Sequence, residues 1–385
     1  MVAITAVRTI PYNYTMTRPI GDVHLPDGTD AGSDMAVLID TDEGVTGVAV
    51  GYGQGTREIA QYAALLIGED PRSVRGLWER MISLTFKMGN AGSTKIAVSG
   101  LDTALWDLRA KLNGVPLWKE LGALQGSAAA YASGLDTPLN DHELGDFYRR
   151  MAGSGINSGK LKVGRDLDAD LRRLEIMRDA LATSGKRPVL MIDSNEYWTP
   201  KQSIRRIREI ERSYDLLWAE EPAERRDVVG LRSVSRAISA SVATGENLDN
   251  SLDFANLIRG EAVDVIQVGA LTGGITGALQ VAEMAHANRI PVAMMNCPGR
   301  HMAHLAAALP HHIAMEVLDC GRDQMFTHEA RLVDGRIELG DSPGSGIVFD
   351  EERLLANAAD VPSPRSLRSI YRRDPGYWTS EFRSP

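Results

Sequence analysis

Three carboxylate residues recur at nearly even intervals in the middle of the sequence. Asp193 ends the segment VLMID, Glu220 ends LLWAE, and Glu246 follows SVATG. Their separations of 27 and 26 residues (220 − 193 and 246 − 220) match about one strand followed by one helix. If the three segments are consecutive strands of a parallel barrel, all three side chains reach the same open end. Three hard oxygen donors there predict a site for a divalent cation such as Mg2+.

Two lysines precede this group by about one further strand-and-helix unit. Lys160 and Lys162 flank a leucine in SGKLK, and alternation along a strand places both on one face. Neighbouring ammonium groups and nearby metal charge lower a lysine pKa from about 10.4 toward neutrality, which would make one lysine a usable base. Two surface lysines on an edge strand are the alternative, but a closed barrel has no edge. Asn195 and Glu221, next to the carboxylates, are expected to support them or contact the substrate.

A repeated strand–loop–helix pattern predicts the barrel that these side chains require. The expected strands lie near residues 129–133, 158–163, 188–193, 215–220, 241–245, 263–268, 291–295 and 313–317. Helical segments such as TPKQSIRRIREIERS fall between them. This alternation requires parallel strands, and eight of them close an α/β barrel of the TIM type. A doubly wound open sheet is the alternative, disfavoured because no GxGxxG motif follows the first strand.

The segments on either side of the barrel predict a smaller α+β capping domain. Strand-like stretches come first, and three helical stretches follow, over residues 57–68, 72–86 and 93–112. We expect a capping domain over residues 1–125, the barrel over 126–320, and a C-terminal return over 321–385 that completes the capping domain. The return contains a hairpin that turns at Asp334-Gly335. Its aromatic and arginine-containing tail, residues 366–385, is expected to pack as an arm on its own or a neighbouring subunit of a homo-oligomer.

Composition excludes several classes of partner. The chain has 385 residues and a net charge of −9, whereas binding to nucleic acid requires a clustered basic face. No run of about 18 apolar residues predicts a membrane span, and the N-terminus resembles a strand rather than a cleavable signal. Cys297 and Cys320 cannot form a disulfide framework, which favours a reduced, cytoplasmic setting. We therefore expect a cytoplasmic protein without nucleic-acid or membrane partners.

Several motifs accompany the lysines and carboxylates in a fixed order. They are SGLDTALWDLRAK, AEEP at 219–222, GEN at 245–247, DVIQVGALTGGIT at 264–276, a glutamate at 316 and SPGSGI at 342–347. Each motif alone is weak, but their order and spacing over nearly the whole chain closely resemble the enolase superfamily, mandelate racemase subgroup. The resemblance implies Mg2+ bound by the three stepped carboxylates. It also implies that Lys162 removes the α-proton of a carboxylate substrate, that Lys160 tunes it, and that Glu316 hydrogen-bonds the substrate carboxylate.

The second face of the site departs from the pattern of this subgroup, which pairs a histidine at the end of the seventh strand with an aspartate at the end of the sixth. Asp264 is assigned to the aspartate, and counting back from His304 places Asn296 at the histidine position. Asparagine does not titrate and cannot be a second base. His301, five residues further on, could replace it, although a histidine at a helix start more often has a packing role. One-base chemistry is favoured.

Two capping-domain segments are expected to contact the far end of the substrate, as a mobile lid or as ordinary polar loops. They are residues 16–33, with Arg18, Asp22, His24 and Asp27, and residues 51–54, with Tyr52 and Gln54. This polar set suits a small hydroxylated carboxylate. We therefore expect Mg2+-dependent dehydration of a sugar acid to a 2-keto-3-deoxy product. The alternatives are a racemase, epimerase or cycloisomerase of a carboxylate or lactone, and a metal-binding barrel that binds acids without turnover.

Overall fold

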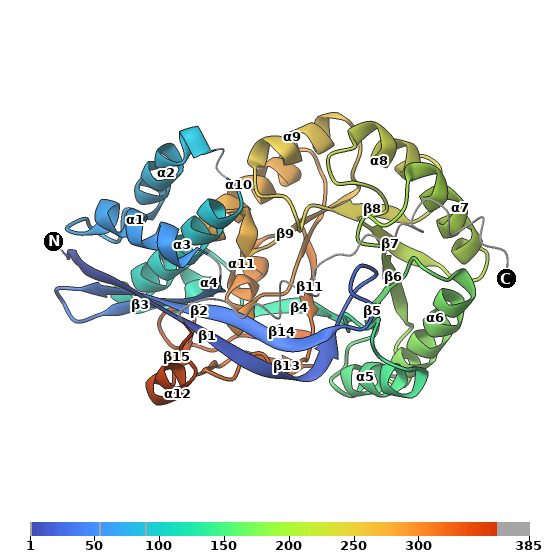
Figure 1. The fold of residues 1–385 in the computed structure, drawn as a ribbon, viewed down its shortest axis with the longest axis horizontal. Helices are drawn as coiled ribbons and strands as arrows, with labels where there is room; N and C mark the ends of the chain where they lie inside the picture. The colour runs from blue at the N-terminus through green and yellow to red at the C-terminus, as the bar shows by residue number, and fades with distance from the viewer. Residues whose placement is uncertain (1, 54, 89–90, 360–385) are drawn as a thin grey trace.

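The computed structural model describes residues 2–53, 55–88 and 91–359, and its central feature is a closed parallel barrel (Figure 1). The barrel strands are β4 (Ser127–Ser133), β5 (Ser158–Lys162), β6 (Val189–Asp193), β7 (Leu216–Glu220), β8 (Ser241–Thr244), β9 (Val265–Val268), β10 (Val292–Met294) and β11 (His312–Val317). Each strand pairs with the next, and β11 pairs with β4 in parallel to close the ring. All eight expected strands are present, and the predicted barrel is confirmed.

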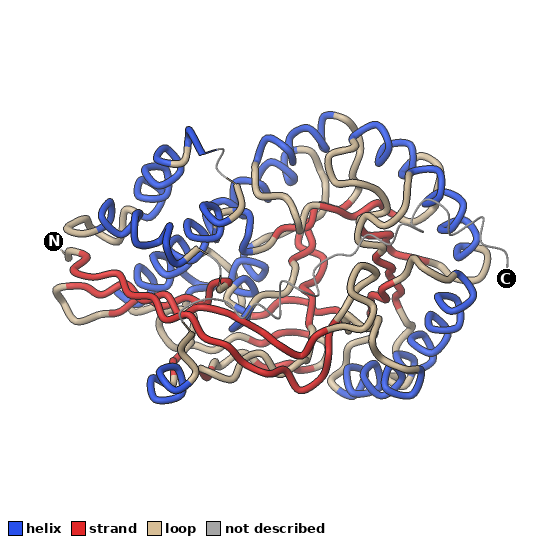
Figure 2. Tube along the Cα trace, viewed as in Figure 1, coloured by secondary structure: helices blue, strands red, loops and turns tan. Residues whose placement is uncertain are grey.

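Helices follow the first seven barrel strands and cover the outside of the barrel (Figure 2). They are α5 (Asp141–Gly153), α6 (Leu167–Ala182), α7 (Pro200–Glu211), α8 (Val228–Ser235), α9 (Ser251–Arg259), α10 (Gly274–Ala287) and α11 (Met302–Ala308), with short 3-10 turns at Ala270–Thr272 and Pro298–Arg300. Capping boxes fix two of the helix starts. Asn140 pairs with Glu143 before α5, and Thr199 pairs with Gln202 before α7, where Pro200 occupies the first turn.

The capping domain consists of an antiparallel sheet and helices beside it. The strands are β1 (Ile4–Ile20), β2 (Thr29–Thr41) and β3 (Thr46–Tyr52), and the helices are α1 (Thr56–Leu66), α2 (Val74–Leu84), α3 (Ser93–Leu112) and α4 (Leu117–Glu120), with a 3-10 turn at Phe86–Met88. The expected loop over residues 16–33 is therefore wrong at both ends. Strand β1 runs to Ile20 and β2 begins at Thr29, because the two strands pair along most of their length.

Helix α3 connects the capping sheet to the barrel. Asp102, fully buried on this helix, accepts hydrogen bonds from the Thr276 amide (2.8 Å) and hydroxyl (2.6 Å) in the first turn of α10. One turn further along, Asp107 accepts from the amides of Val48 (2.8 Å) in β3 and Ser345 (2.6 Å) in the C-terminal return. Two buried carboxylates on one helix therefore hold three parts of the chain together.

The C-terminal return contributes to both the capping domain and the barrel. It contains β12 (Phe326–Thr327), β13 (Arg331–Val333), β14 (Arg336–Glu338), β15 (Val348–Phe349) and α12 (Glu351–Ala356). The hairpin β13–β14 turns at Asp334-Gly335 and pairs with β4. Phe326 and Ile347 pack with Leu38 and Val50 of the capping sheet. The expected arm over residues 366–385 lies outside the described residues. In the described part of the chain, no helix combines the length and apolarity needed to cross a membrane.

Candidate active site

Adjacent barrel strands place Lys162, Asp193 and Glu220 side by side at their carboxyl ends. In the parallel ladder Lys162 lies opposite Asp193, and Asp193 lies opposite Glu220. Glu246 follows β8 after Gly245, which has a φ of 131°. A Cβ at Gly245 would lie 2.5 Å from a backbone carbonyl oxygen of β9, so only glycine fits this turn. The turn brings Glu246 to the other two carboxylates.

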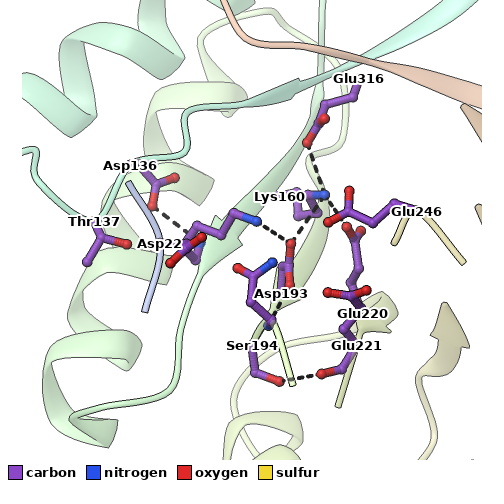
Figure 3. Close-up of polar contacts among 12 residues, drawn as sticks. Asp22, Asp136, Thr137, Lys160, Asp193, Ser194, Glu220, Glu221, Glu246 and Glu316 are labelled. Carbon is purple, nitrogen blue, oxygen red and sulfur yellow. Dashed lines mark hydrogen bonds and ion pairs between the residues drawn. The ribbon is translucent and has the colours of Figure 1, made fainter. Parts of the chain in front are cut away.

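The three carboxylates form a cluster that fits a divalent cation. One oxygen from each of Asp193, Glu220 and Glu246 lies within 4.8 Å of the other two (Figure 3). Asp193 and Glu220 are buried, whereas Glu246 is half-buried and lines a cavity of about 340 Å³. Trp218 Nε1 (3.1 Å) and Gln267 Nε2 (2.5 Å) donate to Glu220 Oε2 and fix its orientation. A cluster of hard oxygen donors beside an open cavity suits Mg2+, since this ion keeps positions for water or substrate.

Both lysines are buried against these carboxylates. Lys160 Nζ lies 2.5 Å from Glu220 Oε1 and 3.0 Å from Glu316 Oε1, and Lys162 Nζ pairs with Asp193 Oδ2. Burial lowers the pKa of Lys162, but the attraction of Asp193 and other carboxylates outweighs it and raises the pKa above its ordinary value. The pKa of Lys160 is raised in the same way. Without the charge of a cation, the surrounding carboxylates outweigh the repulsion between the two ammonium groups. The expected lowering of the pKa includes that cation charge and stays a prediction.

Glu316, at the end of β11, connects the lysines to a second polar chain. Its Oε2 accepts from Asn296 Nδ2 (2.5 Å), and Asn296 Oδ1 accepts from Arg322 (2.7 Å). Burial raises the pKa of Glu316, but Lys160 and Lys162 outweigh this effect and lower it to about 2. Glu316 is therefore an ionised acceptor in this arrangement, whereas the resemblance implied a hydrogen-bond donor to the substrate carboxylate.

Asp264 lies away from the carboxylate cluster, and its assignment to the end of the sixth strand is wrong. Strand β9 begins after it, at Val265, so Asp264 is at the amino end of the barrel. Its Oδ2 accepts from Ser235 Oγ (3.0 Å) and the Val242 amide (2.8 Å). At the carboxyl end of β9 the chain has Gly269, where a Cβ would lie 2.2 Å from the side chain of Met295. The Met295 side chain therefore occupies the space that a side chain at position 269 would need.

The wall that follows β10 is formed by Met295 and Asn296, both of which line the cavity. His301 begins the next helical segment, is 1% exposed, and is not among the described residues that line the cavity. Burial lowers the pKa of His301 to about 4. Asn296 rather than His301 therefore faces the carboxylate cluster, and neither supplies a base there at neutral pH.

His304, one turn further along in α11, has a structural role that predicts a pH effect. Its Nδ1 accepts from the Trp118 amide (3.1 Å), and burial lowers its pKa to about 3. Below pH 6.5 His304 is protonated in the unfolded chain but stays neutral in the folded chain. The free energy of unfolding therefore decreases as pH falls from 6.5 toward 3. Relative to a His304→Asn variant, the wild type is expected to lose about 1.4 kcal/mol of unfolding free energy per pH unit below 6.5.

Chemical denaturation at pH 7.5 and 5.0 measures this difference. His142→Asn is the matched control, because His142 is exposed on α5. A gap between wild type and His304→Asn that stays constant with pH would contradict the buried, neutral state of His304.

The expected substrate contacts divide into two groups. Tyr52 and Asn195 line the cavity, and the Asn195 amide donates to Asp193 Oδ1 (2.8 Å). His24 Nε2 lies 2.7 Å from the Asn195 carbonyl oxygen, and His24 is not among the described residues that line the cavity. Arg18 is misassigned, because its guanidinium donates to the carbonyls of Gly134 and Leu318 rather than entering the cavity. Gln54 lies outside the described residues.

Three residues that the sequence did not single out also line the cavity. Arg322 follows β11, and Asp34 and Tyr14 come from the facing capping strands β2 and β1. Tyr14 donates to Asp34 Oδ2 (2.8 Å), and Arg322 lies 3.7 Å from Asp34 Oδ1. An aspartate within the apolar stretch DMAVLI was the one available signal. The position of Arg322 depends on a tertiary contact across almost 300 residues.

Comparison with known proteins agrees with this geometry. The model "Enolase C-terminal domain-like" matches residues 143–353, and "Mandelate racemase / muconate lactonizing enzyme, N-terminal domain" matches residues 15–122. The chain is 31% identical over 331 residues to 3,6-anhydro-alpha-L-galactonate cycloisomerase of Streptomyces coelicolor, covering 83% of this chain and 90% of that one. It is 32% identical over 352 residues to L-talarate/galactarate dehydratase of Salmonella typhimurium, covering 88% and 86%. The crystal structure of that dehydratase with Mg and L-lyxarohydroxamate matches with a TM-score of 0.84 at 28% identity, over 93% of each chain.

Proposed function

The chain belongs to the mandelate racemase and muconate lactonizing enzyme family of the enolase superfamily, and we propose that it dehydrates a sugar acid by removing the proton α to the carboxylate. The observation that carries this proposal is the asymmetry of the cavity. Lys162 lines one side together with Glu246, whereas Met295 and Asn296 form the wall after β10. Among the described lining residues Lys162 is the single lysine, and no histidine accompanies it.

The carboxylate end of the substrate is placed at the cluster of Asp193, Glu220 and Glu246, which hold Mg2+. The cation supplies positive charge to the substrate carboxylate and so makes the α-proton more acidic. Lys162, whose Nζ lies at the edge of the cluster and lines the cavity, would accept that proton as the free amine, a form that cation charge on the carboxylates would favour by weakening the pairing with Asp193. Lys160, held between Glu220 and Glu316, keeps a fixed positive charge beside the enediolate that forms.

A one-base elimination follows from this arrangement. The C2 proton moves to Lys162, the C2–C3 double bond forms, and the C3 hydroxyl leaves with the proton that Lys162 returns, as water. The enol then tautomerises to a 2-keto-3-deoxy acid. Loss of proton and hydroxyl from the same face requires one acid–base residue, which matches a cavity whose other wall carries an asparagine and a methionine.

Cycloisomerisation is the second candidate, favoured by the 31% identity to a cycloisomerase. That reaction also begins with loss of the α-proton, but an intramolecular C–O bond breaks and no water leaves. A single lysine serves this chemistry as well, so the two reactions share Lys162 and differ in the leaving group.

Incubation with Mg2+ and a panel of sugar acids, lactones and anhydro acids in deuterated water tests the proposal. Dehydration is expected to give a 2-keto product with deuterium at C3, measured by NMR and by reaction of the ketone with semicarbazide. Exchange at C2, or ring opening without loss of water, would favour an isomerase. If no acid of the panel shows proton exchange or gives a product, that result contradicts the proposed function.

A further inference from the structure

Asp34 and Arg322 form a charged pair in the cavity wall and are not part of the carboxylate cluster. Asp34 is 2% exposed on β2, and Arg322 follows β11, so the capping domain and the barrel supply one member each. Arg322 Nη2 lies 3.7 Å from Asp34 Oδ1, and both residues line the cavity that holds Lys162 and Glu246. A buried ion pair is expensive to desolvate and is weak evidence for stability. Its position in the cavity wall points to a role in binding.

The two members of this pair retain hydrogen-bonding capacity. Tyr14 donates a hydrogen bond to Asp34 Oδ2 (2.8 Å). Arg322 lies 3.7 Å from Asp34 Oδ1, which is close enough for an ion pair but too far for a hydrogen bond. Arg322 Nη1 donates to Asn296 Oδ1 (2.7 Å), and the buried Nε of Arg322 has no hydrogen-bond partner among the described residues. The wall therefore offers a charged acceptor beside a charged donor. A hydroxyl group satisfies both, because it donates and accepts at once.

The charge balance of this wall disfavours a second anionic group on the substrate. Asp34 compensates Arg322, and Asp22 adds a further carboxylate to the cavity lining. A second carboxylate at the far end of the substrate only accepts hydrogen bonds, so it would be attracted by Arg322 and repelled by Asp34. Four neutral lining residues of the capping domain carry hydroxyl groups, namely Tyr14, Thr29, Ser33 and Tyr52, and they lie beside the apolar Met16, Ile20 and Ala31.

Resting on the function proposed above, we propose that the Asp34–Arg322 pair binds a neutral hydroxylated tail, so that the substrate is a monocarboxylic rather than a dicarboxylic sugar acid. The pair selects at the end of the substrate opposite the carboxylate that loses its α-proton. Asp34 accepts from a tail hydroxyl and Arg322 donates to the same or the adjacent one. Asp34 also rejects diacids.

Matched pairs of acids with four to six carbons test this selection, namely threonate and tartrate, xylonate and xylarate, gluconate and glucarate, and galactonate and galactarate. Binding to the Mg2+-loaded protein is measured by calorimetry, and kcat/KM is measured where turnover occurs. We expect the wild type to prefer the monoacid by at least about tenfold in its best pair. Asp34→Asn is expected to remove most of that preference by strengthening diacid binding.

Asp30→Asn is the matched control, because Asp30 lies on the same strand but is exposed and not among the residues that line the cavity. It is expected to keep the wild-type ratio. Asp34→Ser is used if Asp34→Asn does not fold. A wild type that binds diacids as tightly as monoacids, binds no monoacid, or keeps its ratio in the folded Asp34 variant would overturn the assignment. The binding measurement does not require turnover, so failure of the proposed chemistry and failure of this selection are separate results.

Discussion

Lys162→Ala is expected to reduce α-proton exchange and product formation by about 10³-fold while Mg2+ binding persists. Positioned general bases contribute typically about 10²- to 10⁴-fold, and no other lysine among the described residues lines the cavity. Removal of this ammonium group also frees Asp193, with which Lys162 pairs. The dissociation constant for Mg2+ is therefore expected to stay equal or to fall, because one competing positive charge is gone.

The two readouts separate a base from a structural lysine. Proton exchange is followed by NMR in deuterated water, and Mg2+ binding by calorimetry. Lys201→Ala, on the exposed side of α7, is the matched control and is expected to leave both unchanged. Unchanged turnover in Lys162→Ala would remove Lys162 as the base, and loss of Mg2+ binding together with activity would indicate that Lys162 organises the metal site instead.

The barrel and its carboxylate cluster were predictable because they depend on regular spacing. Each strand-and-helix unit returns the chain to the same end of the barrel, so Asp193 and Glu220 come into register from their sequence separation alone. Lys162 is placed by the same register, and its position on the face of Asp193 follows from strand alternation. These predictions needed no knowledge of the loops.

The failures occurred where regular spacing does not decide the position of a side chain. The expected strand near residues 263–268 already has Asp264 at its amino end, so the motif-based assignment of Asp264 to the carboxyl end conflicted with that strand; β9 begins at Val265 and leaves Gly269 at the site end. The effect of the carboxylates on the lysines was left out of the sequence-based expectation, because a pKa depends on all neighbours, and without a cation the carboxylates outweigh lysine–lysine repulsion. Asp34 and Arg322 were missed because their contact joins distant parts of the chain.

Glu246→Gln is expected to remove Mg2+-dependent stabilisation without weakening the metal-free protein. Burial raises the pKa of Glu246, and repulsion from Asp193 and Glu316 raises it further. Lys160 and Lys162 lower the pKa, but the net shift is upward. A neutral amide of the same shape relieves that repulsion, so the variant in excess chelator should unfold at an equal or higher temperature than the wild type. Loss of one of three anionic ligands should weaken Mg2+ binding by at least about 100-fold.

Thermal unfolding in chelator and in saturating Mg2+ measures both effects. At a free Mg2+ concentration 100 times the wild-type dissociation constant, the wild type should gain about 2.7 kcal/mol, and the variant, then near its own dissociation constant, less than about 0.5 kcal/mol. Glu224→Gln is the control, because Glu224 is exposed in the loop after β7 and outside the cluster. An unchanged Mg2+ shift in Glu246→Gln would exclude Glu246 as a ligand. If Glu246→Gln is less stable than the wild type in chelator, Glu246 supports the fold through its attraction to the lysines. The expected result requires the opposite balance, in which repulsion from the other carboxylates and the cost of burial outweigh that attraction, so that neutralising this metal ligand costs no stability.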